Sequence, residues 1–136
     1  MSVFRDAAHA GEFIGGFFRE ESVDGGRFFA GSGLVYCYTL SDLGVRIVVD
    51  ASIEPQPGRR FGVYVNDPNA PEPTVEFIAD SETFHRVYSG DVQPLTLMAA
   101  GKIKTKGNVA AAMRTLPGLV ILISHYKAYS AKHGVA

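Results

Sequence analysis

The sequence predicts an α+β domain with a five-stranded, mainly antiparallel sheet and helices at both ends. Two observations support this class. Much of residues 34–80 alternates apolar and polar side chains, as strands do, whereas residues 3–21 and 108–132 repeat apolar side chains at helical spacing. A chain of 136 residues can bury roughly two-thirds of its unfolded surface around one core. We therefore expect a single domain over residues 1–136.

The first predicted element is an amphipathic helix over residues 3–21. Its apolar positions recur mostly at helical spacing: Phe4, Ala7, Ala8, Phe13, Ile14, Phe17 and Phe18. Gly11, Gly15 and Gly16 each weaken a helix by about 1 kcal/mol relative to alanine. We expect a kink or break at these glycines unless tertiary packing holds the helix together. The glycine-rich residues 25–33 follow as a loop.

Four strand-like runs come next. Residues 33–40 alternate between two faces, one with Leu34, Tyr36, Tyr38 and Leu40 and the other with Val35, Cys37 and Thr39. After the turn SDLG, residues 45–52 alternate as a half-solvated antiparallel strand and complete a hairpin. Residues 61–66 and 74–80 continue the meander around a proline-rich loop, because its three closely spaced prolines exclude helix and central strand.

Two short helices are predicted after the fourth strand. Asp80 or Ser81 can cap the first of them, and Gly90 closes it. Pro94 stands at a favoured early position of the second helix, which ends at Gly101.

The last third of the chain holds a fifth strand and two helical segments. The strand KIKTK would turn Ile103 and Thr105 inward, and its outward side chains are Lys102, Lys104 and Lys106. Asn108 can cap a helix that Pro117–Gly118 interrupts, after which residues 119–132 form a final amphipathic helix.

Composition excludes several classes of partner. A net charge of −1 provides no global field that would attract nucleic acid or an anionic membrane, so we expect no nucleic-acid partner. Cys37 is the only cysteine, so no internal disulfide can form, which suits a cytoplasmic location. We expect no signal peptide, because Arg5, Asp6, His9 and Glu12 stand where it would need an unbroken apolar stretch. We also expect no transmembrane segment, because the longest later apolar run, Leu119–Ile123, is far shorter than about 20 residues.

The segment 74–118 resembles the sterol carrier protein-2 family. That family's pattern is a strand, an acidic helix cap with a phenylalanine, a glycine, a proline-led helix, then Gly-Lys-x-Lys-x-x-Gly-Asp and a helix. The matching positions run in order: Asp80, Phe84, Gly90, Asp91, Pro94, Met98, Gly101, Lys102, Ile103, Lys104, Gly107 and Leu116. Two positions depart from the pattern: Thr105 stands where the family has an aliphatic residue, and Asn108 replaces the aspartate.

The resemblance implies an apolar cavity between sheet and helices for a fatty acid, a fatty acyl-CoA or a sterol, with no cofactor and no catalysis. The residues we expect to line it come from the last third of the chain: Leu95, Met98, Ile103, Thr105, Met113, Leu116, Leu119, Leu122 and Ile123. Thr105 would make one wall more polar. An ordinary filled core is the alternative interpretation of the same residues.

No pattern in the chain favours an enzyme or a metal site. Ser124 and His125 are adjacent on a predicted helix, so their side chains point about 100° apart and cannot easily share a proton. Glu82 and His85 share a helix face, but helix capping explains the acids nearby and no further ligands follow in sequence. Thr96 stands where a phosphate-binding loop needs a glycine.

Two functions from other classes stay open. The same fold could be an interaction or dimerisation module that uses an exposed apolar face such as Phe13, Phe17, Phe18 or Val120, which makes a homodimer possible. It could also be an accessory subunit of a lipid-catabolic enzyme. The lysine row of the fifth strand could meet an anionic headgroup, although a solvated strand face explains it more simply.

Overall fold

The computed structural model describes residues 3–24, 29 and 32–134. Five strands form one sheet in the order β3-β2-β1-β4-β5. They are β1 (Val35–Leu40), β2 (Val45–Asp50), β3 (Gly62–Val65), β4 (Val75–Ala79) and β5 (Lys104–Gly107). This confirms the α+β class with a mostly antiparallel sheet. Most of the predicted loop 25–33 lies outside the described residues.

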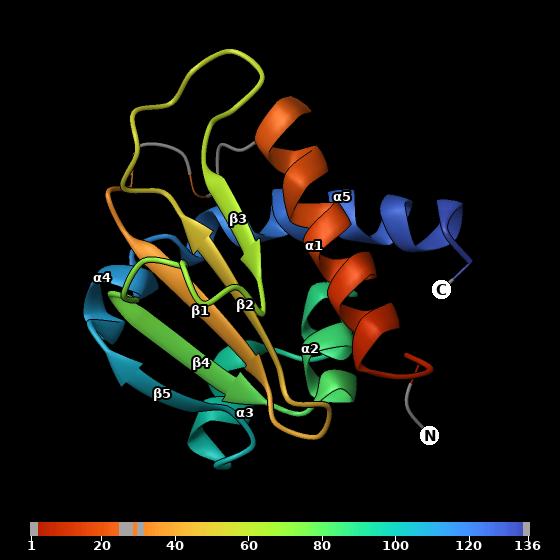
Figure 1. Cartoon of the computed structure of the whole chain (residues 1–136). Coiled ribbons are helices and arrows are strands. Elements are labelled where there is room, and N and C mark those ends of the chain that lie inside the picture. Colours follow the sequence, from red (N-terminus) through yellow and green to blue (C-terminus); the bar gives the residue numbers. More distant parts are fainter. Residues whose placement is uncertain (1–2, 25–28, 30–31, 135–136) are drawn as a thin grey trace.

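The fourth strand corrects the predicted meander. Instead of following β3, β4 lies beyond β1 and pairs with it in parallel, with Tyr38 opposite Phe77. The proline-rich connection between β3 and β4 therefore has to pass across the sheet, and Figure 1 shows it running in front of β1 and β2. Every other strand pair is antiparallel.

That crossing loop also changes the second strand. We expected β2 to be half-solvated, yet of its six residues only Arg46 is exposed. On the outer face, Val35, Cys37 and Val48 form a small buried cluster, against which Tyr64 of β3 and Ala70 of the crossover pack. The loop thus covers part of the face that sequence alternation assigned to solvent.

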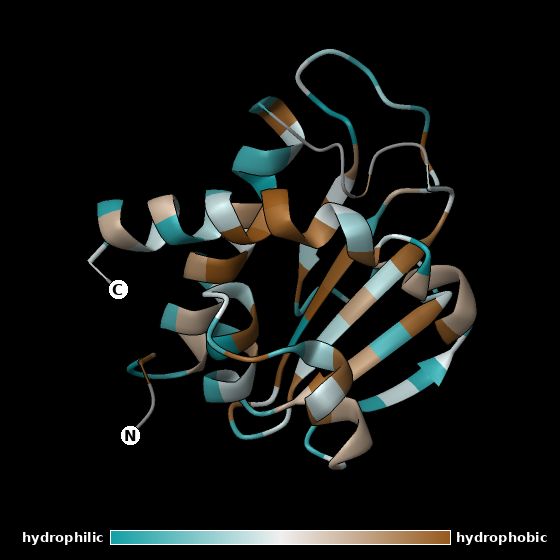
Figure 2. Cartoon of the chain, turned by 180° about the vertical axis from the view of Figure 1, so that it is seen from behind, coloured by the Kyte–Doolittle hydropathy of each residue, from teal (hydrophilic) through white to brown (hydrophobic). Residues whose placement is uncertain are grey.

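The helices gather on the opposite face of the sheet. They are α1 (Ala7–Asp24), α2 (Ser81–Tyr88), α3 (Pro94–Ala99), α4 (Val109–Met113), the short 3₁₀ turn η1 (Leu116–Gly118) and α5 (Leu119–Lys132). In Figure 1 α5 passes behind the sheet, and in Figure 2, from behind, it lies in front of it. Its buried side chains are Leu122, Tyr126, Tyr129 and Ser130.

Helix α1 runs through its three glycines without a break. A Cβ built on Gly15 would lie 2.6 Å from Val65 Cγ2, and one on Gly16 would lie 2.6 Å from the Tyr129 hydroxyl. The glycines therefore sit where α1 approaches β3 and α5 most closely. Tertiary packing holds the helix, which offsets the low helix propensity of these residues.

Caps and turns fix helix α2 as the sequence predicted. The Asp80 side chain accepts a hydrogen bond from the Thr83 amide at 2.7 Å. Asp42, in the β1–β2 turn, accepts from the Ser81 amide and hydroxyl at 2.9 and 2.7 Å, which ties this turn to the helix. Gly90 follows the helix with a φ of +79°, a conformation that glycine adopts without strain.

Candidate functional site

A partly open cavity lies between the helix-covered face of the sheet and the helices of the last third of the chain. Its wall combines β1, β4, α2, α3, α4, η1 and the start of α5. The lining residues are Tyr36, Tyr38, Thr39, Leu40, Phe77, Ala79, Thr83, Phe84, Val87, Tyr88, Pro94, Met98, Ile103, Ala112, Met113, Thr115, Leu116 and Leu119. The cavity has a volume of about 90 Å³.

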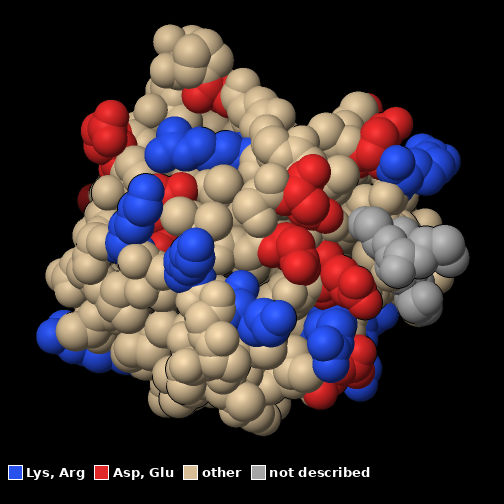
Figure 3. All heavy atoms as spheres, turned by 90° about the horizontal axis from the view of Figure 1, so that it is seen from below, with Lys and Arg blue, Asp and Glu red and all other residues tan. Residues whose placement is uncertain are grey.

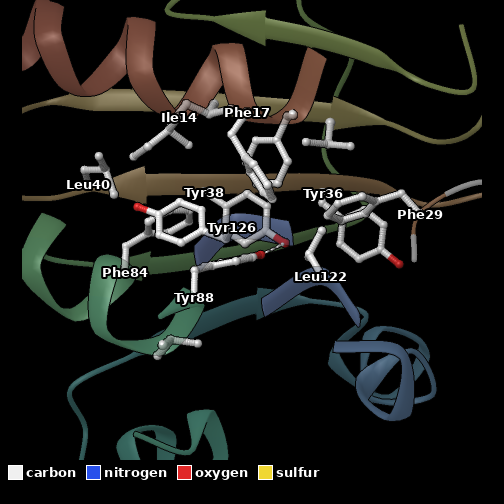
Figure 4. Close-up of a cluster of buried hydrophobic side chains, with 14 of the residues drawn as sticks. Ile14, Phe17, Phe29, Tyr36, Tyr38, Leu40, Phe84, Tyr88, Leu122 and Tyr126 are labelled. Atoms are coloured by element: carbon white, nitrogen blue, oxygen red, sulfur yellow. Dashed lines mark hydrogen bonds between the residues drawn. The ribbon is translucent and has the colours of Figure 1, made fainter. Parts of the chain in front are cut away.

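The chemical character of this cavity is apolar and uncharged. None of the described lining residues is a lysine, arginine, histidine, aspartate or glutamate. Aromatic rings supply one side of it, and Figure 4 shows Tyr36, Tyr38, Phe84 and Tyr88 within one continuous cluster. Such a wall can bind hydrocarbon but offers no group that could balance a buried charge.

A pair of tyrosines adds a polar feature to the wall. Tyr88 donates its hydroxyl to the Tyr38 hydroxyl at 2.8 Å, drawn as a dashed line in Figure 4. Burial raises the pKa of both side chains above the usual value of a tyrosine. Both hydroxyls are therefore neutral and can only donate or accept hydrogen bonds at physiological pH.

The structure brings five of the predicted site residues to the cavity and places four elsewhere. Those that line it are Met98, Ile103, Met113, Leu116 and Leu119. The other four are Leu95, which is exposed, Thr105, which is half-buried on β5, Leu122, which is buried in the core, and Ile123, which lies against the turn at Gly90.

Sequence reasoning missed the half of the wall that comes from the sheet and α2. Sequence alternation predicts that Tyr36 and Tyr38 share one face of β1, and Phe84, Val87 and Tyr88 lie on α2, but nothing in the sequence links these residues to a cavity. Alternation along β1 and helical spacing along α2 indicate which way these side chains point. Only the parallel placement of β4 beside β1 brings Phe77 next to them, with its ring stacked 5.8 Å from that of Tyr38.

The outer wall of the cavity is built from short, weakly buried elements. Helix α3 has six residues and η1 has three, and neither contains a buried residue. Helix α4 has five residues, of which Ala112 alone is buried. Segments with so few buried contacts are the ones that open at low cost in free energy.

A model of the SCP-2 sterol transfer family matches residues 17–116. The chain belongs to this family. Membership places it among sterol- and lipid-binding carrier domains, in agreement with the apolar cavity. A comparison with curated proteins gives no match.

Solved structures share the SCP-2 fold at low sequence identity. The sterol carrier protein domain 2 of Helicoverpa armigera has 18% identity and a TM-score of 0.58, with 78% of this chain and 81% of that chain covered. Apo sterol carrier protein 2 from Yarrowia lipolytica has 17% identity and a TM-score of 0.55, with coverage of 84% and 89%.

The same fold also occurs inside a larger enzyme. The sec-alkylsulfatase Pisa1 from Pseudomonas sp. has 16% identity and a TM-score of 0.50, with 65% of this chain covered. This SCP-2 chain corresponds to only 13% of the sulfatase. At such identity the likeness shows the fold alone.

The other side chains that could carry chemistry have structural partners in this SCP-2 domain. His85 is buried and its Nδ1 lies 2.8 Å from the Tyr126 hydroxyl. His125, on the surface of α5, lies 2.9 Å from a Glu21 carboxylate oxygen. Cys37 is fully buried, and burial raises the pKa of its thiol. Within the described part of the chain, no group of three or more His, Cys, Asp or Glu side chains could hold a metal ion.

Exposed charge and exposed apolar side chains follow the predictions in part. Lys104 and Lys106 are exposed on β5 and Lys102 is exposed just before it. Figure 3 shows charged groups of both signs interspersed on the face seen from below. The apolar docking face suggested for α1 is wrong, because Phe13, Phe17 and Phe18 are at most 6% exposed and belong to the core. Val120 is 73% exposed.

Among the described residues, one segment has the length and composition of a membrane span. Val109–Lys132 is long and apolar enough to cross a bilayer by length and composition alone, and 22% of its most apolar window is buried. A single segment of this kind is weak evidence of a span. Here its α5 part packs Leu122, Tyr126 and Tyr129 into the core, as a helix of a globular domain does.

Proposed function

We propose that this chain is a non-catalytic carrier that holds a fatty acyl chain or a sterol-like ligand in the cavity between the sheet and helices α2 to α5, and that it works in the cytoplasm. The observation that supports this most directly is the uncharged apolar lining of the cavity. Membership of the SCP-2 sterol transfer family supports the same ligand class.

The free energies of apolar burial and of hydrogen bonding indicate how such a ligand would be bound. Burial of about ten methylene groups at roughly 0.8 kcal/mol each gives about 8 kcal/mol, which corresponds to a micromolar complex. One net hydrogen bond adds only about 1 kcal/mol. Affinity would therefore follow the apolar area that the ligand buries, and chain length would matter more than the fine chemistry of the tail.

The cavity must widen to take a complete lipid. Its volume of about 90 Å³ is below the range of roughly 300–1,000 Å³ that ligand pockets usually have. Strands β1 and β2 and helix α2 are firmly packed, so the widening falls to α3, α4 and η1, which contain almost no buried residues. Outward movement of these three elements would both admit the ligand and enlarge the site.

Native mass spectrometry of the freshly purified protein, followed by organic extraction, tests the carrier function. We expect a stoichiometric co-purifying lipid, or uptake of added palmitate by the apo protein. A clean apo mass that takes up neither palmitate nor a fluorescent fatty acid would contradict the proposal.

A pair of matched variants tests the location of the ligand. Ala112→Leu adds three carbon atoms to the cavity wall and should lower ligand affinity at least about tenfold, since each lost tenfold corresponds to 1.4 kcal/mol. Ala70→Leu adds the same group on the outer face of the sheet and should leave affinity unchanged. Equal affinities for the two variants would exclude this cavity as the site.

A docking role is the second candidate function. Val120 and Ile121 on α5 are 73% and 56% exposed, and Leu95 on α3 is 55% exposed. These side chains could meet a partner protein or a second copy. A mass that increases with protein concentration, in a protein that takes up no lipid, would favour this candidate.

A further inference from the structure

Two buried tyrosine hydroxyls in the cavity wall have unused hydrogen-bonding capacity. Tyr36 is 1% exposed and lines the cavity, and its hydroxyl has no hydrogen-bond partner among the described residues. Tyr38 is 8% exposed and is joined to Tyr88 by one hydrogen bond. Two hydroxyls joined by one bond still leave one hydroxyl proton without an acceptor. Figure 4 shows the Tyr36 hydroxyl pointing away from the Tyr38–Tyr88 pair.

Such groups are rare in native proteins and call for a physical reason. Most buried polar side-chain atoms have a hydrogen-bond partner, because an unpaired buried donor loses its bonds to water without replacement. A phenylalanine at position 36 would fill the same space without that penalty. Tyr36 and Tyr38 both line the cavity, and the Tyr36 hydroxyl is closed off in its present form, so an acceptor that enters as the cavity widens can complete their bonding.

The charge of the wall restricts which acceptor can enter. A carboxylate or a phosphate taken into a low-dielectric cavity needs a cationic partner, and the described lining residues include no lysine, arginine or histidine. Burial also raises the pKa of Tyr38 and Tyr88, so neither becomes charged near neutral pH. A neutral oxygen, as in an alcohol, a ketone or an ester, meets both requirements: it accepts a hydrogen bond and brings no charge.

We infer that Tyr36 is a polar anchor inside the cavity, and that the domain selects lipids whose buried head is a neutral hydroxyl or carbonyl over carboxylates of equal chain length. The inference rests on the proposed carrier function and adds the head-group class to it. Charged lipids would have to leave their head at the mouth of the cavity and bind through the tail alone.

Displacement of diphenylhexatriene tests this inference. The probe is a hydrocarbon without hydrogen-bonding atoms, so its affinity measures the apolar cavity alone. The competitors share a twelve-carbon chain and are 1-dodecanol, 2-dodecanone and laurate, measured at pH 8, where laurate is ionised. We expect the alcohol and the ketone to displace the probe at concentrations at least about tenfold lower than laurate does, a difference of about 1.4 kcal/mol.

The variant Tyr36→Phe separates an anchor from a structural role. Relative to the probe, its affinity for dodecanol and dodecanone should fall about fivefold to tenfold, with no change for laurate, and its melting temperature should stay equal or rise. Tyr64→Phe removes a hydroxyl on the outer face of the sheet and is the matched control.

Each of the remaining outcomes contradicts a different part of the proposal. Equal displacement by laurate and dodecanol in the wild type would overturn the head-group preference. An unchanged dodecanol affinity in Tyr36→Phe would mean that a trapped water is the hydrogen-bond partner of the Tyr36 hydroxyl. Parallel losses of affinity for the probe, the alcohol and laurate would mean a packing defect. Either result would overturn the role of Tyr36 as an anchor. Failure of the wild type to bind diphenylhexatriene at all would instead refute the carrier function on which the inference rests.

Discussion

Single glycines at the ends of β5 show how a residue without a side chain can be required by its surroundings. Gly101 and Gly107 bracket the short strand, and both have a positive φ, +76° and +86°. Their neighbourhoods differ. A Cβ on Gly101 would meet nothing within 4 Å, whereas one on Gly107 would run into the backbone carbonyl oxygen of Thr74. Gly107 is therefore fixed by both conformation and close approach.

We predict that Gly107→Ala destabilises the fold far more than Gly101→Ala does. The positive φ alone costs a residue with a Cβ about 1–2 kcal/mol, which is the expected loss at Gly101. At Gly107 the start of β4 must also move, so the free energy of unfolding should drop by about 3–4 kcal/mol. Urea denaturation of the two variants measures the difference, and equal losses would show that close approach to Thr74 does not matter.

His85 gives the stability of the domain a defined pH dependence. His85 is 8% exposed, and its imidazole lies near Tyr126, Ser89, Phe4 and Asp91. Burial lowers the pKa of His85 below the value of 6.5 that the unfolded chain has, despite the opposing charge of Asp91. Below about pH 6.5 the unfolded chain therefore binds more protons than the folded chain.

We predict that the free energy of unfolding decreases as the pH falls from about 6.5 towards the lower pKa of His85 in the folded state. Above pH 6.5 the contribution of His85 to stability is fully present. His85→Gln should flatten this part of the profile, whereas His133→Gln, at an exposed position, should not. Urea denaturation between pH 5 and pH 8 provides the test. A profile for His85→Gln that parallels the wild type would assign the dependence to other groups.

At the scale of elements, the domain combines a firmly packed half with a loosely packed one. Helix α1 buries nine of its residues, including the three phenylalanines Phe13, Phe17 and Phe18. Phe17 meets the ring of Tyr126 edge to face at a centroid distance of 5.0 Å. By contrast, α3, α4 and η1 bury Ala112 alone. The cavity lies on the boundary between these halves, where one wall can move while the other holds its shape.

We expect Pro117–Gly118, where η1 meets α5, to be the hinge about which η1 moves to admit the ligand, and this yields a prediction about ligand exchange. Gly118 has a φ of −79° and a ψ of −9°, which alanine can adopt without strain. Gly118→Ala should therefore stiffen the hinge by about 0.4–1 kcal/mol and slow ligand exchange about twofold to fivefold. Stopped-flow transfer of diphenylhexatriene from the protein to excess vesicles measures the rate. Ser124→Ala, at an exposed position later in α5, is the control. Exchange rates that match the wild type in both variants would count against ligand entry by movement of η1.

At the scale of the whole molecule, one crossover decides the architecture. The connection between β3 and β4 passes over the outer face of the sheet, so β4 can pair in parallel with β1 and β5 can become the far edge. The crossover covers one face and the helices cover the other. The cavity then forms beside β1 and β4, away from β2 and β3, the strands on which α1 mainly packs.

The sequence by itself determined the elements and their faces. Period-two alternation located β1, β2 and β5, Asp80 and Asn108 marked helix starts, and Gly90 and Gly101 marked helix ends, because these signals depend only on nearby residues. The same local signals, with the resemblance to sterol carrier protein-2, pointed to the last third of the chain, where Met98, Ile103, Met113, Leu116 and Leu119 line the cavity.

Only the tertiary structure decided the strand order, the continuity of α1 and the complete wall of the cavity. A strand presents the same alternation to any neighbour, so nothing local in β4 says that it pairs with β1. Gly15 and Gly16 weaken a helix until Val65 and Tyr129 pack against them. Tyr36 is an ordinary core residue in sequence, and its unpaired hydroxyl has meaning only because a cavity lies beside it. Each of these features depends on residues far apart in the chain, whose proximity exists only after folding.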